Sequence, residues 1–284
     1  MKFSIEKVDP SSQQEVICFL QKHENYALFL LGNLAAHGVT LSEAPNSANF
    51  QIIRSSQKIV AVFALTRRGN LLVQASLQES IFDILLQACL AEKVPLTGLL
   101  GEWNFCSSFW KFLKTKKIIT TDIFTTKEIL YSKQIPSFTD IIQAPVRYLT
   151  AKDYPQWKIL RFDYLAEEGI PHDLTSEQLH EQFLTKAQEK IIWGYFCQDT
   201  LVSIAELNAK AIGIGQVGGV YTAPLFRKKG YAKAILSQMM IDVRKTHNLH
   251  KLLIFTQENN NASNRLYESL EASRIGYFAM FFGS

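Results

Sequence analysis

Hydrophobic and polar residues follow two periods along this chain, and the elements that they predict come in nearly the same order twice. Alternating or β-branched runs predict strands, and apolar residues spaced three and four apart predict helices. The first half predicts a strand, two helices, three strands, a helix, a strand, a helix and a strand pair, at residues 3–8, 11–23, 24–38, 50–56, 58–68, 70–76, 78–93, 96–101, 105–115 and 118–132.

The second half repeats this order from residue 146. A strand and a helix that begins near Asp153 lie within residues 146–169, and Thr175 with Gln178 forms a capping box before the next helix. Strands are then predicted at residues 191–197, 201–209, 212–222, 250–256 and 275–282, with helices from Tyr231 and within residues 258–270. The order predicts an α+β chain of two tandem domains, each a mixed, mostly antiparallel twisted sheet flanked by helices.

The boundary between the two domains is expected where the hydrophobic pattern stops. Residues 137–145 are polar, bounded by proline and without a steady period, which is typical of a linker. The sequence therefore predicts one domain at residues 1–136 and a second at residues 146–284.

Composition and charge narrow the class of protein. The 284 residues are 47% hydrophobic and 20% charged, which suits a chain with buried cores. The net charge of +4 is mildly basic, and no aromatic-interleaved basic patch indicates a nucleic-acid surface. The first residues lack the apolar core of a signal peptide, and no apolar run approaches a membrane span. We expect a cytoplasmic protein that binds neither membrane nor nucleic acid.

The stretch Gln216–Ala232 carries the clearest chemistry. An apolar strand runs into a turn with three cations, then Gly230, and at once becomes a helix. The first turn of a helix has backbone N–H groups without intrahelical partners, and the helix dipole adds partial positive charge there. Glycine lets the backbone approach phosphate oxygens closely. Residues 227–232 therefore predict a pyrophosphate site, although turn chemistry alone also places basic residues and glycine at strand-to-helix turns.

Two motifs in this half resemble the GCN5-related N-acetyltransferase (GNAT) family. Its first signature, a strand with V-x-x-x-P followed by R/Q-x-x-G-x-G/A and a helix, is matched by Val220, Pro224, Arg227, Gly230 and Ala232. The helix that follows carries an apolar stripe of Ile235, Leu236, Met239, Met240 and Val243. The second, N-x-x-A-x-x-L-Y, is matched by Asn260, Ser263, Leu266 and Tyr267, with serine in the alanine place. The segment 24–34 also looks like the opening helix of bacterial tandem proteins of this family.

The resemblance implies that acetyl-CoA binds between two splayed parallel strands, here 215–222 and 252–256. Such splaying leaves main-chain groups that the pantetheine arm can pair with. The residues that the family pattern assigns to the cofactor are Val220, Tyr221, Thr222, Arg227, Lys228, Lys229, Gly230, Tyr231, Ala232 and Asn260.

The implied activity is direct transfer of an acetyl group to the amine of a small-molecule or amino-acid-like acceptor. Tyr267 resembles the family's general acid, although a packed tyrosine on an amphipathic helix has the same pattern. Many relatives carry an acidic residue where this chain has Gln216, an amide that cannot take a proton. Glu206 is the candidate base, with an outward-facing strand glutamate and a water relay as alternatives. Glu167 and Glu168 lie where relatives form the acceptor rim.

One departure from the family pattern follows Tyr267. Glu271 and Ala272 stand where the family has glycine and an aromatic residue, which predicts a changed helix end. With Gln216, this departure favours a second function, a catalytically weak or inactive CoA-binding sensor or scaffold of the same fold. Acceptor identity, acyl chain length and oligomeric state, monomer or homodimer, have no sequence signal.

The first half lacks the cofactor pattern. Its counterpart of the basic turn, residues 74–79, has no glycine and no cation, and Glu79 at the helix start would oppose a phosphate. We expect this domain to be a degenerate copy without CoA.

Other motifs carry less weight. Residues 213–218 read G-x-G-x-x-G but lie inside a β-rich run instead of opening a helix, which is atypical of a dinucleotide site. The spacing of His172 and His180, and the scattered cysteines, indicate no metal site.

Overall fold

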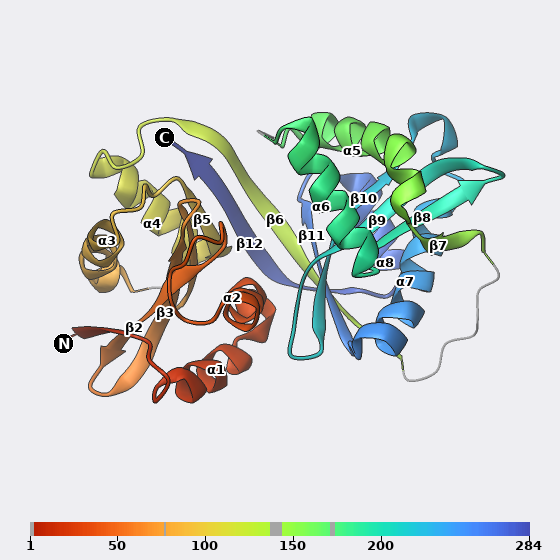
Figure 1. Cartoon of the computed structure of the whole chain (residues 1–284). Coiled ribbons are helices and arrows are strands. Elements are labelled where there is room, and N and C mark those ends of the chain that lie inside the picture. Colours follow the sequence, from red (N-terminus) through yellow and green to blue (C-terminus); the bar gives the residue numbers. More distant parts are fainter. Residues whose placement is uncertain (1–2, 77, 137–143, 171–173) are drawn as a thin grey trace. The chain divides into compact units, whose positions relative to one another are not determined.

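The structure is a computed structural model that describes residues 3–76, 78–136, 144–170 and 174–284 (Figure 1). Packing divides the chain into two compact units, Met1–Leu130 with Ile275–Ser284, and Tyr131–Arg274. The predicted domains, 1–136 and 146–284, place the last strand in the second half, whereas this strand packs in the first unit. Most of the predicted linker, residues 137–143, lies outside the described residues.

The first unit is a mixed sheet with strand order β1-β2-β3-β4-β5-β12-β6. Only β4 and β5 are parallel among the pairs for which a register is given, and the others are antiparallel. The elements are β1 (Phe3–Lys7), α1 (Gln13–Lys22), α2 (Glu24–His37), β2 (Ala48–Ser55), β3 (Lys58–Thr66), β4 (Asn70–Ala75), η1 (Glu79–Ile81), α3 (Phe82–Ala91), β5 (Gly98–Glu102), α4 (Trp103–Thr115), β6 (Asp122–Gln134) and β12 (Ser273–Gly283).

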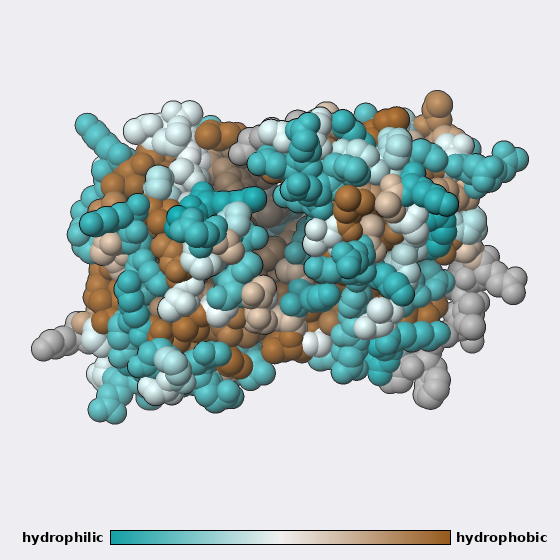
Figure 2. Space-filling model, in the orientation of Figure 1, coloured by the Kyte–Doolittle hydropathy of each residue, from teal (hydrophilic) through white to brown (hydrophobic). Residues whose placement is uncertain are grey.

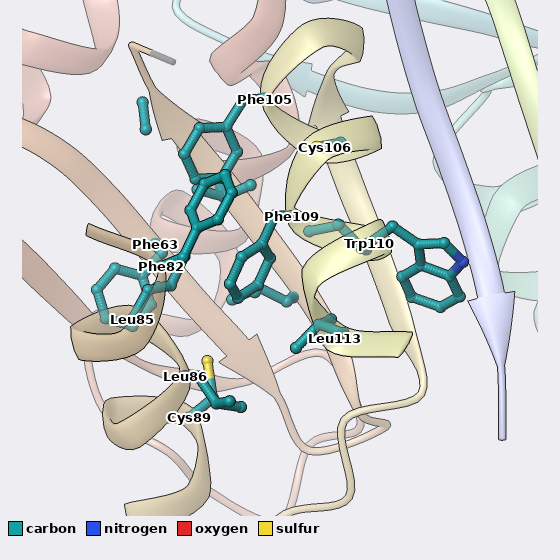
Figure 3. Close-up of a cluster of buried hydrophobic side chains, with 14 of the residues drawn as sticks. Phe63, Phe82, Leu85, Leu86, Cys89, Phe105, Cys106, Phe109, Trp110 and Leu113 are labelled. Atoms are coloured by element: carbon teal, nitrogen blue, oxygen red, sulfur yellow. The ribbon is translucent and has the colours of Figure 1, made fainter. Parts of the chain in front are cut away.

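Aromatic side chains form the centre of the first unit's core (Figure 3). Helix α4 buries Phe105 and Phe109, one helical turn apart, and Phe82 at the start of α3 packs edge-on against both rings, with centroids 5.5 and 5.2 Å away. Strand β12 adds Phe281, whose ring lies 5.5 Å from that of Trp110. Apolar residues from the C-terminal end of the chain thus complete the core of the first unit.

The second unit repeats the arrangement with strand order β6-β11-β10-β9-β8-β7. Strands β10 and β11 are parallel, and β7 to β10 pair antiparallel. The elements are β7 (Val146–Tyr148), η2 (Ala151–Asp153), α5 (Tyr154–Glu168), α6 (Ser176–Gln188), β8 (Ile192–Cys197), β9 (Thr200–Ala211), β10 (Ile214–Thr222), η3 (Pro224–Phe226), α7 (Tyr231–His247), β11 (Lys251–Gln257) and α8 (Asn261–Ser269).

The helices of the second unit are held by the apolar faces that the sequence predicted. The stripe on α7 is buried throughout: Ile235, Leu236, Met239, Met240 and Val243. On the α5 and α6 side, Trp157 packs against Phe183 with ring centroids 4.8 Å apart. The capping box at Thr175 and Gln178 is confirmed, with reciprocal side-chain hydrogen bonds.

The predicted α+β class with two tandem, mostly antiparallel sheets is confirmed. The expected strand pair in residues 118–132 was wrong, because this run forms the single long strand β6. Hydrophilic residues cover most of the face that Figure 2 shows, with smaller hydrophobic areas between them. Within the described parts of the chain, no helix has both the length and the apolar character needed to cross a bilayer.

Candidate functional site

The two parallel strands of the second unit part from one another halfway along their length. Paired residues run from Ile214 opposite Lys251 to Val217 opposite Ile254 and stop there, although β10 continues to Thr222 and β11 to Gln257. Beyond these pairs the two strands continue without pairing to one another, as the resemblance to the GNAT family implied. We call the place where they part the opening, and its two walls the β10 arm, residues 218–222, and the β11 arm, residues 255–257.

A bulge in β10 lies at the base of this opening. Its pairing with β9 shifts between Gln216 and Val217, and again between Gly218 and Tyr221, so that residues 219 and 220 have no partner in that register. Gly219 has a φ of 57°, which suits glycine, and a Cβ atom there would lie 3.1 Å from Cγ of Glu206. The bulge therefore brings the backbone of β10 close to the Glu206 side chain.

The end of the β10 arm is already held by the protein. The Thr222 carbonyl accepts a hydrogen bond from Nε of Arg227, at 2.9 Å, and the Tyr221 carbonyl accepts one from the Ser203 hydroxyl, also at 2.9 Å. These bonds leave Val220, inside the bulge, as the predicted arm residue whose main chain is outside the β9 register.

The turn after the β10 arm presents backbone N–H groups. From Lys228 to Lys233, these groups donate to no acceptor among the residues that the structure describes. Lys228 and Gly230 have φ values of 63° and 82°, and a Cβ atom at Gly230 would meet nothing within 4 Å. These six consecutive N–H groups, which have no acceptor in the described part of the chain and lie at the positive end of a 17-residue helix, suit an anionic ligand.

The three cations of the turn differ in their surroundings. Arg227 pairs with Glu167 of α5, with 2.6 Å between a guanidinium nitrogen and Oε2, and it lies over the Tyr221 ring at 5.3 Å. The hydrogen bond to Glu167 raises the pKa of Arg227 above its ordinary value. Lys229 lies over the Phe226 ring at 5.3 Å, and Lys228 is exposed.

Asn260 lies just beyond the β11 arm and caps helix α8. Its Oδ1 accepts a hydrogen bond from the Ser263 N–H at 3.1 Å, and its Nδ2 donates to Oε1 of Glu168 at 3.2 Å. Burial raises the pKa of Glu168, and the adjacent Glu167 carboxylate adds to this shift. The last two residues of α5 thus contact both sides of the opening. Glu167 contacts Arg227 in the turn after the β10 arm, and Glu168 contacts Asn260, the cap of α8, after the β11 arm.

Tyr267 lies on the inner side of α8 and is 4% exposed. Its ring is 5.7 Å from that of Tyr131, whose hydroxyl donates to Oδ1 of Asn264 at 3.0 Å. The Lys233 ammonium donates to the Ser269 carbonyl at 3.0 Å and so connects the first turn of α7 to the last turn of α8. Tyr267 is therefore on the helix that follows the β11 arm.

Glu206 is buried between two cations on neighbouring helices. Its carboxylate accepts from Lys186 of α6 at 2.9 Å and from Arg161 of α5 at 3.3 Å, and the residue is 3% exposed. Burial alone would raise the pKa of this carboxyl, but Lys186 and Arg161 together outweigh it and lower the pKa. Glu206 is thus held as a carboxylate of weak basicity.

Gln216 is also buried, at the first register shift of β10 and three residues before the bulged Gly219. Its amide donates to the Val217 carbonyl, and its Oε1 has no hydrogen-bond partner among the described residues. The Gln216 amide does not titrate, so this residue of β10 cannot act as a general base.

The first unit has a different arrangement at the matching place. Strand β4 pairs with β5 from Asn70 to Val73 and ends two residues later, at Ala75, so that its free arm is short. Helix α3 follows a 3₁₀ turn that begins with Glu79, and its first residue, Phe82, is buried in the aromatic core of Figure 3. An acidic residue and an apolar core stand where the second unit has cations and glycine.

Sequence reasoning missed several partners of the predicted residues. Glu167 was placed at the rim without its ion pair to Arg227, and Tyr131, Arg161 and Lys186 were not singled out. These partners lie between 20 and 136 residues from the groups that they contact, so no local spacing indicates them. Within the described ranges, no cluster of three or more His, Cys, Asp or Glu side chains is arranged to hold a metal ion.

The family of the second half follows from its sequence. Residues 154–271 match the model of the Acetyltransferase (GNAT) family. This segment contains α5 to α8 and strands β8 to β11, including the parted strands and the basic turn. The second half of the chain therefore carries a domain of the GNAT acetyltransferase family. Among curated proteins, none is a significant sequence match.

Solved structures extend the likeness of fold to the whole chain. A Drosophila protein is 13% identical, with a TM-score of 0.69 and coverage of 99% of this chain and 98% of that one. A GNAT-family acetyltransferase from Colwellia psychrerythraea is 14% identical, with a TM-score of 0.54 over 99% and 100% of the two chains. A tandem GNAT protein from the clavulanic acid biosynthesis pathway is 10% identical, with a TM-score of 0.51 over 99% and 98%. The chain has the tandem GNAT fold.

Proposed function

We propose that the protein is an acetyl-CoA-dependent N-acetyltransferase that transfers an acetyl group directly to the amine of a small-molecule or amino-acid-like acceptor. The observation that carries this proposal is the continuity of the parted strands with the start of α7. Val220, in the bulge, stands outside the β9 register, and a few residues further along the chain the six N–H groups of residues 228–233 have no acceptor among the described residues. A thioester of a phosphate-bearing cofactor needs both features.

The residues present suit CoA as the ligand. The N–H groups of residues 228–232 would hold the pyrophosphate, with Lys228 and Lys229 adding screened attraction, and Gly230 leaves the backbone open to the phosphate oxygens. Val220 would pair with the pantetheine arm, while Tyr221 and Thr222 shape the wall beside it. Asn260 would contribute by capping α8 at the other wall. Bound acetyl-CoA would supply the acetyl group as an activated thioester.

Two side chains are proposed to move protons. The Tyr267 hydroxyl would protonate the departing thiolate sulfur as general acid. Glu206 is proposed to take the proton of the acceptor amine through a water molecule, since its carboxylate is buried beneath the bulge. Lys186 and Arg161 make it a weak base, so we expect the acceptor to bind as a neutral amine or to lose its proton before transfer.

A second function has specific support. Gln216 cannot accept a proton, and the lowered pKa of Glu206 reduces its basicity. These two features favour a CoA-binding sensor or scaffold with little or no catalysis. Binding of the cofactor is common to both functions, and turnover with an amine separates them.

The first unit is proposed to be a degenerate copy that does not bind CoA. The short β4 arm, Glu79 and the buried Phe82 support this role.

The test of the proposed function is calorimetric titration of the full chain with acetyl-CoA and CoA. We expect micromolar binding with a stoichiometry near one per chain, and loss of binding in Gly230→Glu, where a side chain and a negative charge enter the phosphate position. Asn248→Glu is the control, since Asn248 also adopts the left-handed region, with φ 52° and ψ 37°, and is exposed, but lies at the other end of the same helix.

The outcomes separate the alternatives. Retained affinity in Gly230→Glu would contradict the phosphate site, and a stoichiometry of two would contradict the degenerate first unit. Binding accompanied by thiol release with an amine panel would support the acetyltransferase, whereas binding without thiol release would support the sensor or scaffold.

A further inference from the structure

The C-terminal end of α5 is tied to both sides of the opening between β10 and β11. Oε2 of Glu167 lies 2.6 Å from the guanidinium of Arg227, which follows the β10 arm. Oε1 of Glu168 accepts from Asn260 at 3.2 Å, beyond the β11 arm. Two adjacent acids thus contact the two sides of the proposed cofactor route, and they do so by different means, one through a cation and the other through a neutral amide.

Arg227 is held inside its own turn. Its Nε donates to the Thr222 carbonyl at 2.9 Å, and its guanidinium lies over the Tyr221 ring at 5.3 Å. A terminal guanidinium nitrogen donates a hydrogen bond to the Glu167 carboxylate. A carboxylate on this guanidinium is an anion in contact with the turn where the N–H groups of residues 228–233 have no acceptor among the described residues. Glu167 therefore places negative charge on Arg227, the residue that directly precedes the N–H groups to which the proposed function assigns phosphate.

We propose that Glu167 is a positioning residue for cofactor binding, an internal anion that occupies Arg227 until the phosphates of the cofactor replace it. This inference rests on the proposed function. The ion pair is only partly buried, with side-chain exposures of 38% for Arg227 and 49% for Glu167, so a stronger anion can exchange with it. The bond from Nε to Thr222 belongs to the turn itself and is compatible with either partner.

The exchange has a consequence for the acceptor side of the site. When a phosphate binds the guanidinium, Glu167 is released, whereas Glu168 keeps its contacts with Asn260 and Gln257 on the β11 side. The exchange lowers cofactor affinity by the free energy of the broken ion pair and thereby favours release of the product CoA. Cofactor binding and the position of the end of α5 are coupled.

The test compares two variants that each remove one negative charge from adjacent residues, Glu167→Gln and Glu168→Gln. Calorimetry of the full chain and both variants is performed with CoA and with pantetheine, which lacks the nucleotide phosphates. We expect Glu167→Gln to bind CoA about two- to fivefold more tightly than the parent, and Glu168→Gln to change affinity less than about twofold. Pantetheine should bind all three proteins equally, because it offers no anion to Arg227.

A double variant completes the test. In an Arg227→Gln background, Glu167→Gln should no longer tighten CoA binding, since the exchanged cation is absent. Equal effects of the two glutamate variants, a parallel change for pantetheine, or unchanged or weaker CoA binding by Glu167→Gln would overturn the exchange. If the parent protein binds no CoA, the proposed function itself fails, which is a different result from bound CoA with unchanged affinity in Glu167→Gln.

Discussion

At the scale of single residues, two tyrosines in contact have different surroundings. The rings of Tyr267 and Tyr131 are 5.7 Å apart, yet only Tyr267 stands in the position of the GNAT family's general acid. The Tyr131 hydroxyl bonds with Asn264 and has a second, longer contact, 3.4 Å, with Glu268. Burial raises the pKa of Tyr131 above its ordinary value, and the nearby carboxylate of Glu268 adds to this shift. This pair offers a matched test of the proposed acid.

We predict that Tyr267→Phe keeps CoA affinity and lowers turnover at least ~100-fold, the lower end for lost general-acid assistance. Tyr131→Phe should change turnover by no more than a few fold, because its hydroxyl bonds to α8 side chains. Steady-state thiol release and calorimetry on both variants provide the measurement. Unchanged turnover in Tyr267→Phe, or equal losses in both variants, would remove Tyr267 from the mechanism.

At the scale of elements, the end of α8 explains how the chain departs from the family pattern. Glu271 takes the place of glycine and adopts a φ of 58°, and the Ala272 N–H reaches back to the Tyr267 carbonyl at 3.0 Å. Lysines after α3, α4 and α6 adopt similar positive φ values: Lys93, Lys117 and Lys190. The helix therefore ends with a non-glycine residue in the left-handed region, which costs backbone strain.

We predict that Glu271→Gly stabilises the second unit by about 0.5–1 kcal/mol, because glycine adopts this φ without strain. The substitution also removes an ion pair between Glu271 and Lys133, with 3.4 Å between the charged atoms. Because the Glu271 side chain is 89% exposed, this pair contributes little to the free energy of unfolding. Urea unfolding followed by hydrogen exchange in α8 gives the measurement. Glu271→Ala is the control, since it removes the carboxylate and keeps the strain; equal stability of the two variants would contradict the prediction.

At the scale of the whole molecule, the order of elements along the chain differs from the grouping of elements in space. Strand β12 follows α8 in sequence, yet it pairs with β5 from Phe278 opposite Glu102 to Phe282 opposite Gly98, and Phe281 is buried in the first unit's core. The boundary of the first unit therefore includes residues 275–284. A polypeptide that ends at residue 136 would lack one strand of this sheet.

We predict that Phe281→Ala destabilises the first unit by about 3–5 kcal/mol, the usual range for a large-to-small change in a core. Hydrogen exchange should show lost protection in α4 and β5, where Phe281 contacts Trp103 and Trp110, and unchanged protection in α7. Isoleucine at 275 on the same strand is 36% exposed, and Ile275→Ala is the control. Lost protection in α7 without a change in α4 would contradict the assignment of this strand.

The sequence by itself determined most of the elements, the α+β class, the tandem order and the basic turn. These features depend on neighbours within one element or one turn, such as the buried stripe of α7 or the step from β10 through Gly230 into that helix. Side-chain period and glycine conformation act over a few residues, so they can be read without knowing what packs nearby. The parting of β10 and β11 was predicted as well, from the resemblance of the two motifs to the GNAT family.

Only the tertiary structure decided which charged groups form ion pairs with one another and which unit contains the last strand. Arg227 meets Glu167 from α5, Glu206 meets cations from α5 and α6, and β12 joins the first unit. Such partners are chosen by burial and hydrogen-bond geometry among residues far apart in the chain. Contacts with distant elements do not appear in the residue pattern of the local segment. The neighbours of such a residue, and its pKa, are fixed by packing.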